Sequence, residues 1–181
     1  MTLSIRFAEP QDAPVLAALE SELSAHQKDA ENHFTPEVAR RDGFGSQGEF
    51  VAMLAEWQGE AIGYTLFHDS YETAFAARGI YLCDIYVRPS ARRRGIGRAL
   101  FAAVAKEARR RGRGFVWCAS KTWNADAHAF YRALGAYAEP IVAHALTGKA
   151  FDTLADEAAS WDEAEQPADD FGVARRRASS A

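Results

Sequence analysis

The sequence is poor in cysteine and lacks any long apolar run, and both shortages narrow what the protein can be. It has two cysteines in 181 residues, Cys83 and Cys118, which form no CxxC pair. We therefore expect neither a disulfide framework nor a metal site, and a reducing cytoplasm fits this composition. No stretch approaches the roughly 18 apolar residues of a membrane-spanning helix. Acidic Glu9 interrupts the first residues, so we expect no secretory signal and no membrane partner.

Charge of neither sign dominates, because the net charge is −4, but arginine is unevenly distributed. One group lies within residues 88–98 and a second within residues 109–113. Concentrated arginine in a mildly acidic protein indicates a local anion site rather than a surface for polyanions. We interpret the second group as a solvated helix face. The aromatic residues near both groups occupy positions that look buried, so no stacking platform for nucleic acid is evident.

The order of the expected elements predicts a single α/β (α+β) domain, with helices on the faces of a mixed sheet. Apolar residues make up 48% of the chain, an ordinary share for a globular domain. Periodicity, turn residues and caps predict, in order, strand 4–8, helices 9–28 and 35–43, strands 50–57, 60–68 and 80–87, helix 95–111, strand 115–120 and a helix from Asn124 or Asp126 to Leu134. Residues 136–155 are expected to hold closing strands. The domain is thus assigned to residues 1–155 and a charged, mobile tail to residues 156–181.

The most informative segment is a basic turn that contains two glycines and follows the strand at residues 80–87. Its residues are Arg92, Arg93, Arg94, Gly95, Ile96, Gly97 and Arg98. An amphipathic helix begins there, and backbone N–H groups at a helix start point toward any nearby anion. The glycines permit close approach, and the arginines add charge. The pattern predicts a diphosphate site, although a surface turn with glycines chosen for backbone shape is the alternative.

Other phosphate-binding loops fit this segment badly. A P-loop requires Gly-Lys followed by Ser or Thr, which is absent here. The dinucleotide fingerprint requires a third glycine near Leu100, and none occurs there. Neither of these two phosphate-binding motifs therefore accounts for the segment.

Three separated blocks resemble the GNAT superfamily of N-acetyltransferases. The first is Val87-Arg-Pro followed by Arg92-x-x-Gly95-x-Gly97, and the second is Asn124 followed by residues 129–131 and 134–136. The third, residues 41–45 and 79–87, is similar to the spermidine/spermine (diamine) acetyltransferase branch. The resemblance implies a mostly antiparallel central sheet with helices on both faces. It also implies transfer of an acetyl group from acetyl-CoA to an amine, and a homodimer.

The resemblance also implies roles for individual residues. The pyrophosphate of CoA would bind the turn from Arg92 to Arg98, and the pantetheine arm would pair with the strand edge at Ile85, Tyr86 and Val87. Asn124 matches a CoA contact, and it also suits a helix N-cap. Tyr131 matches the general acid that protonates the CoA thiolate, although a packed aromatic beside Phe130 is the alternative.

The acceptor amine must lose a proton before it attacks, and Asp84 is the nearest candidate carboxylate by motif. Strict alternation along a strand would place Asp84 and Cys83 on opposite faces. The polyamine branch typically has acids at the positions of the two candidate substrate residues, Cys83 and Gln27. Each close charge pair is worth up to about 4 kcal/mol at an effective dielectric constant of about 20. Six other acids are candidates to replace those acids: Glu20, Glu22, Asp29, Glu31, Asp69 and Glu72.

These departures leave the acceptor open. A polyamine, a thialysine-like amino acid and another small amine all fit, and so do a protein N-terminus and an antibiotic amine. A CoA-binding domain without catalysis is a further alternative, which an intact Tyr131 and Asn124 argue against. The cofactor is the better-determined half of the prediction.

Overall fold

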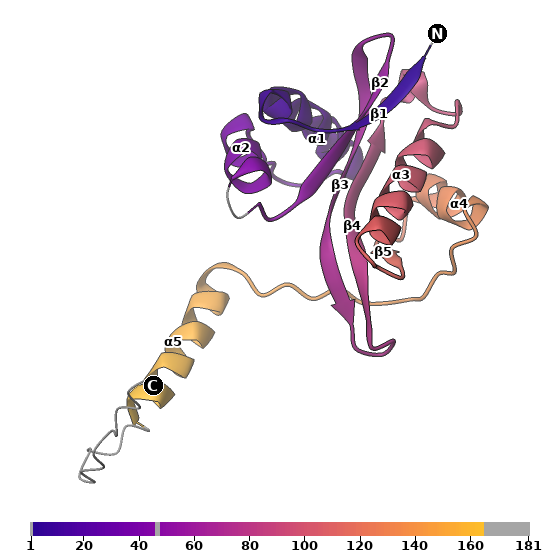
Figure 1. Ribbon diagram of the computed structural model, residues 1–181. Coiled ribbons are helices and arrows are strands. Elements are labelled where there is room, and N and C mark those ends of the chain that lie inside the picture. Colours follow the sequence, from indigo (N-terminus) through magenta and orange to yellow (C-terminus); the bar gives the residue numbers. More distant parts are fainter. Residues whose placement is uncertain (1, 46–47, 165–181) are drawn as a thin grey trace, which may run out of the picture. The chain divides into compact units, whose positions relative to one another are not determined.

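The structure is a computed structural model that describes residues 2–45 and 48–164. The chain divides into two compact units, residues 1–137 and residues 138–181. The first unit contains every candidate site residue. Figure 1 shows a sheet with helices on both sides, as the sequence predicts.

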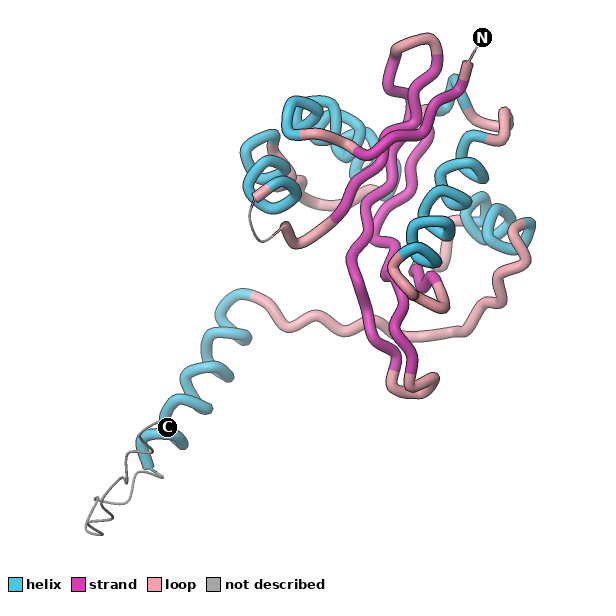
Figure 2. Tube along the Cα trace, viewed as in Figure 1, coloured by secondary structure: helices cyan, strands magenta, loops and turns pink. Residues whose placement is uncertain are grey.

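The sheet of the first unit has five strands in the order β1-β2-β3-β4-β5. β1 to β4 are joined by antiparallel pairing, and β4 and β5 pair in parallel. A tight turn at Gln58 and Gly59, both with positive φ, joins β2 to β3. β3 and β4 continue beyond the neighbouring strands as a long hairpin, which is visible in Figure 2. The strands are β1 (Leu3–Phe7), β2 (Val51–Trp57), β3 (Glu60–Glu72), β4 (Ala77–Val87) and β5 (Val116–Cys118).

Helices cover the two faces of this sheet. α1 and α2 lie on one face, and α3 and α4 lie on the other (Figure 1). Both faces carry an apolar core, since Leu16 and Leu19 of α1 pack with Tyr64 and Tyr86, whereas Val104 of α3 packs on the other side. The helices are α1 (Ala13–Gln27), α2 (Pro36–Phe44), α3 (Ile96–Arg110) and α4 (Ala125–Ala133), and the short 3-10 turns are η1 (Pro10–Asp12) and η2 (Pro89–Ala91). The predicted fold class is confirmed.

A β-bulge interrupts β4 at Cys83. The register with β3 passes from Leu66 opposite Asp84 directly to Phe67 opposite Leu82, so Cys83 has no partner on β3. The bulge reverses which side chains face which layer. Leu82 packs with α3, but Asp84 lies two residues before Tyr86 and shares the α1 face with it. Simple alternation, applied through Cys83, does not predict this placement.

The second unit differs from the sequence prediction. Residues 138–147 form no strand, and α5 extends over Gly148–Ala164, so the closing strands expected within residues 136–155 are wrong for the described residues. The physical reason is composition, because alanine and other good helix formers dominate this stretch and β-branched residues are few. α5 continues past the expected boundary at residue 155. The rest of the predicted tail, residues 165–181, lies outside the described residues.

The close approach of β3 and β4 depends on Gly63. A Cβ atom built there would lie 2.5 Å from the Tyr86 carbonyl oxygen. We expect Gly63→Ala to lower the free energy of unfolding by about 2 kcal/mol, because two backbones cannot move apart cheaply. Gly114→Ala is the matched control, since nothing lies within 4 Å of its Cβ position. Urea unfolding checks both variants, and equal losses would contradict this explanation.

Candidate functional site

The arginine-glycine turn (residues 92–98) joins the end of β4 to the start of α3. Gly95 is the N-cap residue of α3, with φ 79° and ψ 0°, a left-handed conformation that favours glycine. The Arg92 Nε donates a hydrogen bond to the Val87 carbonyl at 2.9 Å, which ties the turn to the strand end. The first N–H groups of α3 lack partners within the helix. The turn therefore presents backbone donors in a fixed position beside β4.

Ion pairing distinguishes the two arginine groups. Arg93, Arg94 and Arg98 form no ion pair with any described residue, whereas Arg110 and Arg111 are both bound by Glu107 at 2.7 Å. The two arginines also lower the pKa of Glu107 to about 2. The arginine-glycine turn thus keeps positive charge available, while much of the charge in the second group is neutralised within the protein.

The edge of β4 beside this turn is unpaired. β5 pairs with β4 only over Ile80–Leu82, and β4 continues to Val87 beyond that contact. Alternate backbone groups of residues 83–87 therefore face away from β3 without a strand partner among the described residues. An extended ligand can add to such an edge as another strand does.

α4 places Tyr131 next to this unpaired edge. The Asn124 side chain accepts a hydrogen bond from the Ala127 N–H at 3.1 Å, so its predicted N-cap role is confirmed. A Cβ atom at Gly97 would lie 3.2 Å from the Phe130 ring, which shows that this glycine lets α4 approach α3. The Tyr131 ring packs edge-to-face against Phe101, with ring centroids 6.3 Å apart. The ring therefore has the packed-aromatic role, and the hydroxyl lies beside the Cys118 thiol of β5.

The hydroxyl of Tyr131 is protonated at any working pH. Burial raises its pKa above the usual value, and Cys118, Asp84 and Tyr81 raise it further. Cys118 on β5 and Asp84 on the bulged part of β4 both influence this hydroxyl. The group can therefore donate a hydrogen bond in this region.

Asp84 is the most perturbed carboxyl group of the site. Its pKa is raised to about 6, mainly by burial and also by the charge of Asp29, while a hydrogen bond from the Tyr64 hydroxyl opposes both effects. Thr65 donates a hydrogen bond to the Asp84 carbonyl at 2.9 Å and so holds the backbone beside the bulge. A carboxyl group with this pKa is mostly ionised at neutral pH and can accept a proton.

Two further acids face Asp84. Burial raises the pKa of Glu20 on α1, and the charges of Asp84 and Asp29 add to this effect. A hydrogen bond from Asn32 opposes the rise for Glu20, as the Tyr64 hydroxyl does for Asp84. We call Glu20, Asp29 and Asp84 the acid cluster. It concentrates negative charge on the α1 side of β4.

The other four candidate acids have partners outside this cluster. Glu22 binds Arg88 at 2.9 Å and accepts a hydrogen bond from the Tyr86 hydroxyl. Asp69 binds Arg113, and Glu31 binds His33. Glu72 accepts a hydrogen bond from the Ala74 N–H. Of the six candidates, Glu20 and Asp29 are the two that reach Asp84.

The predicted substrate residues lie at the margins of the acid cluster. Gln27 is the last residue of α1, two positions before Asp29. Cys83 is the bulged residue itself, and burial and the charge of Asp84 raise its pKa to about 11. The thiol is therefore neutral at pH 7. Sequence reasoning missed Tyr64 and Thr65, because neither residue type is distinctive within an apolar strand.

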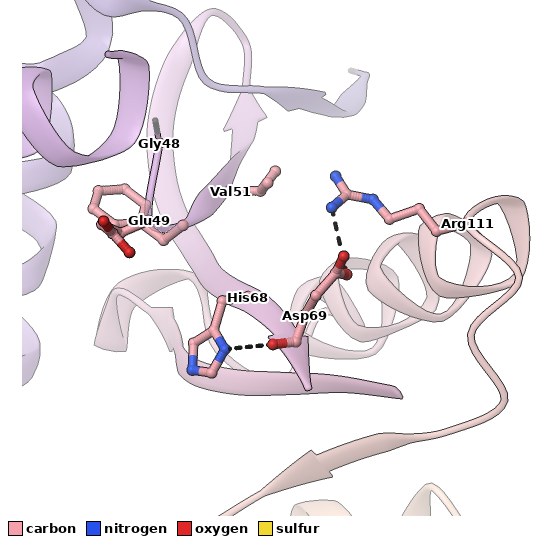
Figure 3. A pocket seen from close by; sticks show the side chains of 7 residues that line it. Gly48, Glu49, Val51, His68, Asp69 and Arg111 are labelled. Atoms are coloured by element: carbon pink, nitrogen blue, oxygen red, sulfur yellow. Dashed lines mark hydrogen bonds and ion pairs between the residues drawn. The ribbon is translucent and has the colours of Figure 1, made fainter. Parts of the chain in front are cut away.

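A cavity of about 510 Å³ lies elsewhere, against the start of β2 and the end of α3 (Figure 3). Among its lining residues, Asp69 alone is a candidate from the sequence. Its charged groups bind one another, since Arg111 approaches Asp69 at 3.7 Å and the His68 Nδ1 lies 2.9 Å from the Asp69 carbonyl oxygen. Its lining residues are Gly48, Glu49, Phe50, Val51, His68, Asp69 and Arg111. The cavity is therefore separate from the acid cluster.

The described residues show neither a cluster of metal ligands nor a membrane-spanning helix. No group of three or more His, Cys, Asp or Glu side chains is arranged to hold a metal ion. No described helix combines the length and apolar character that a bilayer crossing requires.

The comparisons with known proteins agree on one family. The profile of the Acetyltransferase (GNAT) family matches residues 16–136. The thialysine N-epsilon-acetyltransferase of Bos taurus is 36% identical over 141 residues, which cover 73% of this chain and 82% of that enzyme. The L-ornithine N5-acetyltransferase of Arabidopsis thaliana is 40% identical over 74 residues, 41% of this chain and 32% of that enzyme.

A solved structure extends the agreement to the fold. An integron cassette protein from the mobile metagenome of V. cholerae superposes with a TM-score of 0.72 at 19% identity, covering 86% of this chain and 98% of that protein. Identity at this level shows the fold alone. The family profile and the bovine relative carry the assignment: the chain belongs to the acetyltransferase (GNAT) family and is an acetyl-CoA-dependent amine N-acetyltransferase.

Proposed function

We propose that this protein transfers the acetyl group of acetyl-CoA to a primary amine of a small cationic molecule by direct attack. The observation that carries the proposal is the acid cluster, which lies beside the unpaired edge of β4 and near Tyr131. A positively charged amine is the ligand that such a cluster favours. The bovine and plant relatives are named for thialysine and ornithine, both of which carry an amine at the end of a side chain.

The arginine-glycine turn would hold the pyrophosphate of CoA. Free N–H groups at the start of α3 and the unpaired Arg93, Arg94 and Arg98 suit a diphosphate in charge and in hydrogen-bonding capacity. Space is available, because nothing lies within 4 Å of the Cβ position at Gly95. The edge at Ile85, Tyr86 and Val87 would bind the pantetheine arm, and Asn124 would contact CoA near α4. Acetyl-CoA supplies the acetyl group as a thioester.

Asp84 would accept the first proton. An amine with a pKa of about 10.4 is almost entirely protonated at pH 7, so it must lose a proton before it can attack. The nitrogen loses two protons in all while the C–N bond forms and the C–S bond breaks. One proton is balanced by the sulfur, which leaves as a thiol, and the other passes through Asp84 to solvent.

Tyr131 would stabilise the departing sulfur. A thiol has a pKa of about 8.5, which is below that of an unperturbed phenol and further below that of buried Tyr131. Complete proton transfer from the phenol to the thiolate is therefore uphill. The hydroxyl acts best as a hydrogen-bond donor that strengthens as negative charge develops on sulfur, with proton transfer completed as the product forms.

Two expectations stay predictions. The family resemblance implies the homodimer, and the low cysteine content favours a reducing cytoplasm. Sedimentation velocity tests the first, and fractionation tests the second.

A panel of amines tests the proposed function directly. Purified protein, acetyl-CoA and a range of diamines, diamino acids, aminoglycosides and N-terminal peptides are incubated separately, and thiol release and acetylated product are measured. We expect acetylation of small cationic amines. CoA binding without turnover on any amine would overturn the proposal.

The arginine-glycine turn gives a binding prediction. We expect Arg94→Gln and Arg98→Gln each to weaken acetyl-CoA binding about tenfold, the usual effect of losing a charge-assisted hydrogen bond. Arg109→Gln, at the far end of the same helix, is the matched control and leaves affinity unchanged. Calorimetry measures all three variants. A loss for Arg109→Gln as large as the others would point to a general charge effect instead.

Tyr131 gives a turnover prediction. Tyr131→Phe keeps the packing against Phe101 and removes the hydroxyl, so kcat falls about 10²-fold while acetyl-CoA affinity is retained. Tyr71→Phe makes the same chemical change at a residue that is 60% exposed, and it leaves kcat unaltered. Steady-state kinetics and calorimetry separate the two parameters. An unchanged kcat in Tyr131→Phe would remove this residue from the mechanism.

Removing the Asp84 carboxylate should raise the free energy of unfolding and lower turnover. Its folded pKa is raised from 3.8 to about 6, so the ionised form opposes folding. The free energy of unfolding of the wild type therefore declines as pH rises from about 4 to about 6. Asp84→Asn avoids this decline and gains at most about 3 kcal/mol above pH 6, at ~1.4 kcal/mol per pKa unit. The same variant loses turnover and the acidic limb of the pH profile near pH 6.

Urea unfolding at pH 4 and pH 7, with kcat/KM measured from pH 5 to pH 9, checks both effects. Asp126→Asn, an exposed acid in the first turn of α4, is the control and shows neither. If the stability gain of Asp84→Asn over the wild type is no larger at pH 7 than at pH 4, the ionised carboxylate does not lower the free energy of unfolding.

A further inference from the structure

Tyr64 brings a buried hydroxyl next to Asp84. The register of β3 and β4 pairs Leu66 with Asp84 and Tyr64 with Tyr86. Directly opposed residues share a face of the sheet, and so do residues two positions apart, so these four side chains all face α1. Tyr64 is fully buried and belongs to the apolar core under that helix. Because Tyr64 is the diagonal neighbour of Asp84 across the two strands, its long side chain can reach the carboxyl group.

Two consecutive residues of β3 hold Asp84. The Tyr64 hydroxyl donates a hydrogen bond to the Asp84 carboxylate. Thr65, which is also fully buried, donates from its Oγ1 atom to the Asp84 carbonyl oxygen at 2.9 Å. The first contact fixes the side chain, and the second fixes the backbone beside the bulge. The Tyr86 hydroxyl on the same face has a different partner, because it donates to the Glu22 carboxylate at 3.2 Å.

The titratable groups that interact with Asp84 are all neutral or acidic among the described residues. Burial and the charge of Asp29 favour the neutral carboxyl group and so raise its pKa. The hydrogen bond from Tyr64 favours the ionised form instead. The ionised carboxylate therefore depends on this hydroxyl. The interacting groups come from α1 and the segment after it, from β3, from β4 and from α4, and they are Glu20, Asp29, Tyr64, Tyr81, Cys83 and Tyr131.

Tyr64 itself stays protonated. Burial, together with the negative charges of Asp84 and Glu20, raises the pKa of the phenol far above its usual value. The hydroxyl therefore donates its hydrogen bond at every working pH and takes no proton from a substrate. A carboxylate has about four acceptor positions on its two oxygens, so one hydrogen bond from Tyr64 leaves room for an ammonium group.

We propose that Tyr64 is a positioning residue for the acetyl transfer, whose hydroxyl orients the Asp84 carboxylate beside the bulge and keeps it ionised at neutral pH. This inference rests on the proposed function, in which Asp84 accepts a proton from the amine. Burial makes Asp84 a stronger base than an exposed aspartate, and Tyr64 limits that effect so that the base is not already protonated at pH 7. The working pH of the enzyme thus depends on a hydroxyl inside the core.

Tyr64→Phe removes the hydroxyl and keeps the ring. We expect the midpoint of the acidic limb of kcat/KM to move upward by about one pH unit, because a charge-assisted hydrogen bond is lost. The value of kcat/KM then falls about fivefold at pH 6 and recovers by pH 9, where Asp84 is ionised in both proteins. Tyr86→Phe makes the same chemical change on the same face and leaves the midpoint in place, since its hydroxyl binds Glu22. An equal loss at every pH in Tyr64→Phe would indicate a packing role and overturn the proposal.

Urea unfolding tests the same contact without turnover. The raised pKa of Asp84 makes the free energy of unfolding decline from about pH 4 to about pH 6, and loss of the hydrogen bond raises that pKa further. We therefore expect Tyr64→Phe to lose more stability at pH 7 than at pH 4. In the Asp84→Asn background this position no longer titrates, so the losses at the two pH values become equal. Equal losses in the wild-type background as well would contradict the proposal.

The two measurements separate this inference from the proposed function. Turnover on amines with an acidic limb that Tyr64→Phe does not move would overturn the role of Tyr64 while leaving amine acetylation intact. Absence of turnover on every amine would instead overturn the proposed function. The comparison of stabilities at pH 4 and pH 7 would then still decide whether Tyr64 holds the Asp84 carboxylate in its ionised form.

Discussion

The β-bulge at Cys83 is the constraint on which the rest of the site depends. With one extra residue, β4 directs Leu82 into the core under α3 and Asp84 toward α1, although both would share a face in a regular strand. Thr65, itself fully buried, supports the backbone by donating to the Asp84 carbonyl. Without the bulge, Asp84 would lie in an apolar layer and Glu20 would face no acid. Catalytic chemistry here follows from a local irregularity in hydrogen bonding.

The acid cluster illustrates a conflict between stability and function. Burial and neighbouring negative charge raise the pKa values of Glu20 and Asp84, which weakens the folded state, and a sequence selected for stability alone would favour apolar residues at these positions. Their presence beside the buried Tyr64 hydroxyl is understandable if a cationic substrate completes the set. Ion pairs elsewhere, such as those of Arg6 with Asp12 and Glu56, are closed within the protein and leave no such deficit.

Local patterns in the sequence were sufficient for the elements and for the arginine-glycine turn. Helix α1, strand β4 and the glycine at residue 95 each follow from periodicity or backbone preference, and the family resemblance placed Tyr131. The bulge could not be predicted from the sequence, because no residue type marks it. The approach of Glu20 and Asp29 to Asp84 was equally hidden, since it depends on how α1 packs across the sheet. The helix at Gly148–Ala164 was missed because closing strands were expected within residues 136–155, where the hydrophobic pattern is weak.

Gly97 has a consequence for how the two halves of the reaction are linked. The residue belongs to the turn assigned to the phosphates, yet the group nearest its missing side chain is the Phe130 ring of α4, one residue before Tyr131. The contact between Gly97 and Phe130 therefore sets the position of Tyr131, which would meet the sulfur, relative to the turn that would bind the phosphates. Segments on the acceptor side, such as the end of α1, take no part in this contact. Evolution can thus remodel the amine pocket freely while the spacing between the two ends of the co-substrate is preserved.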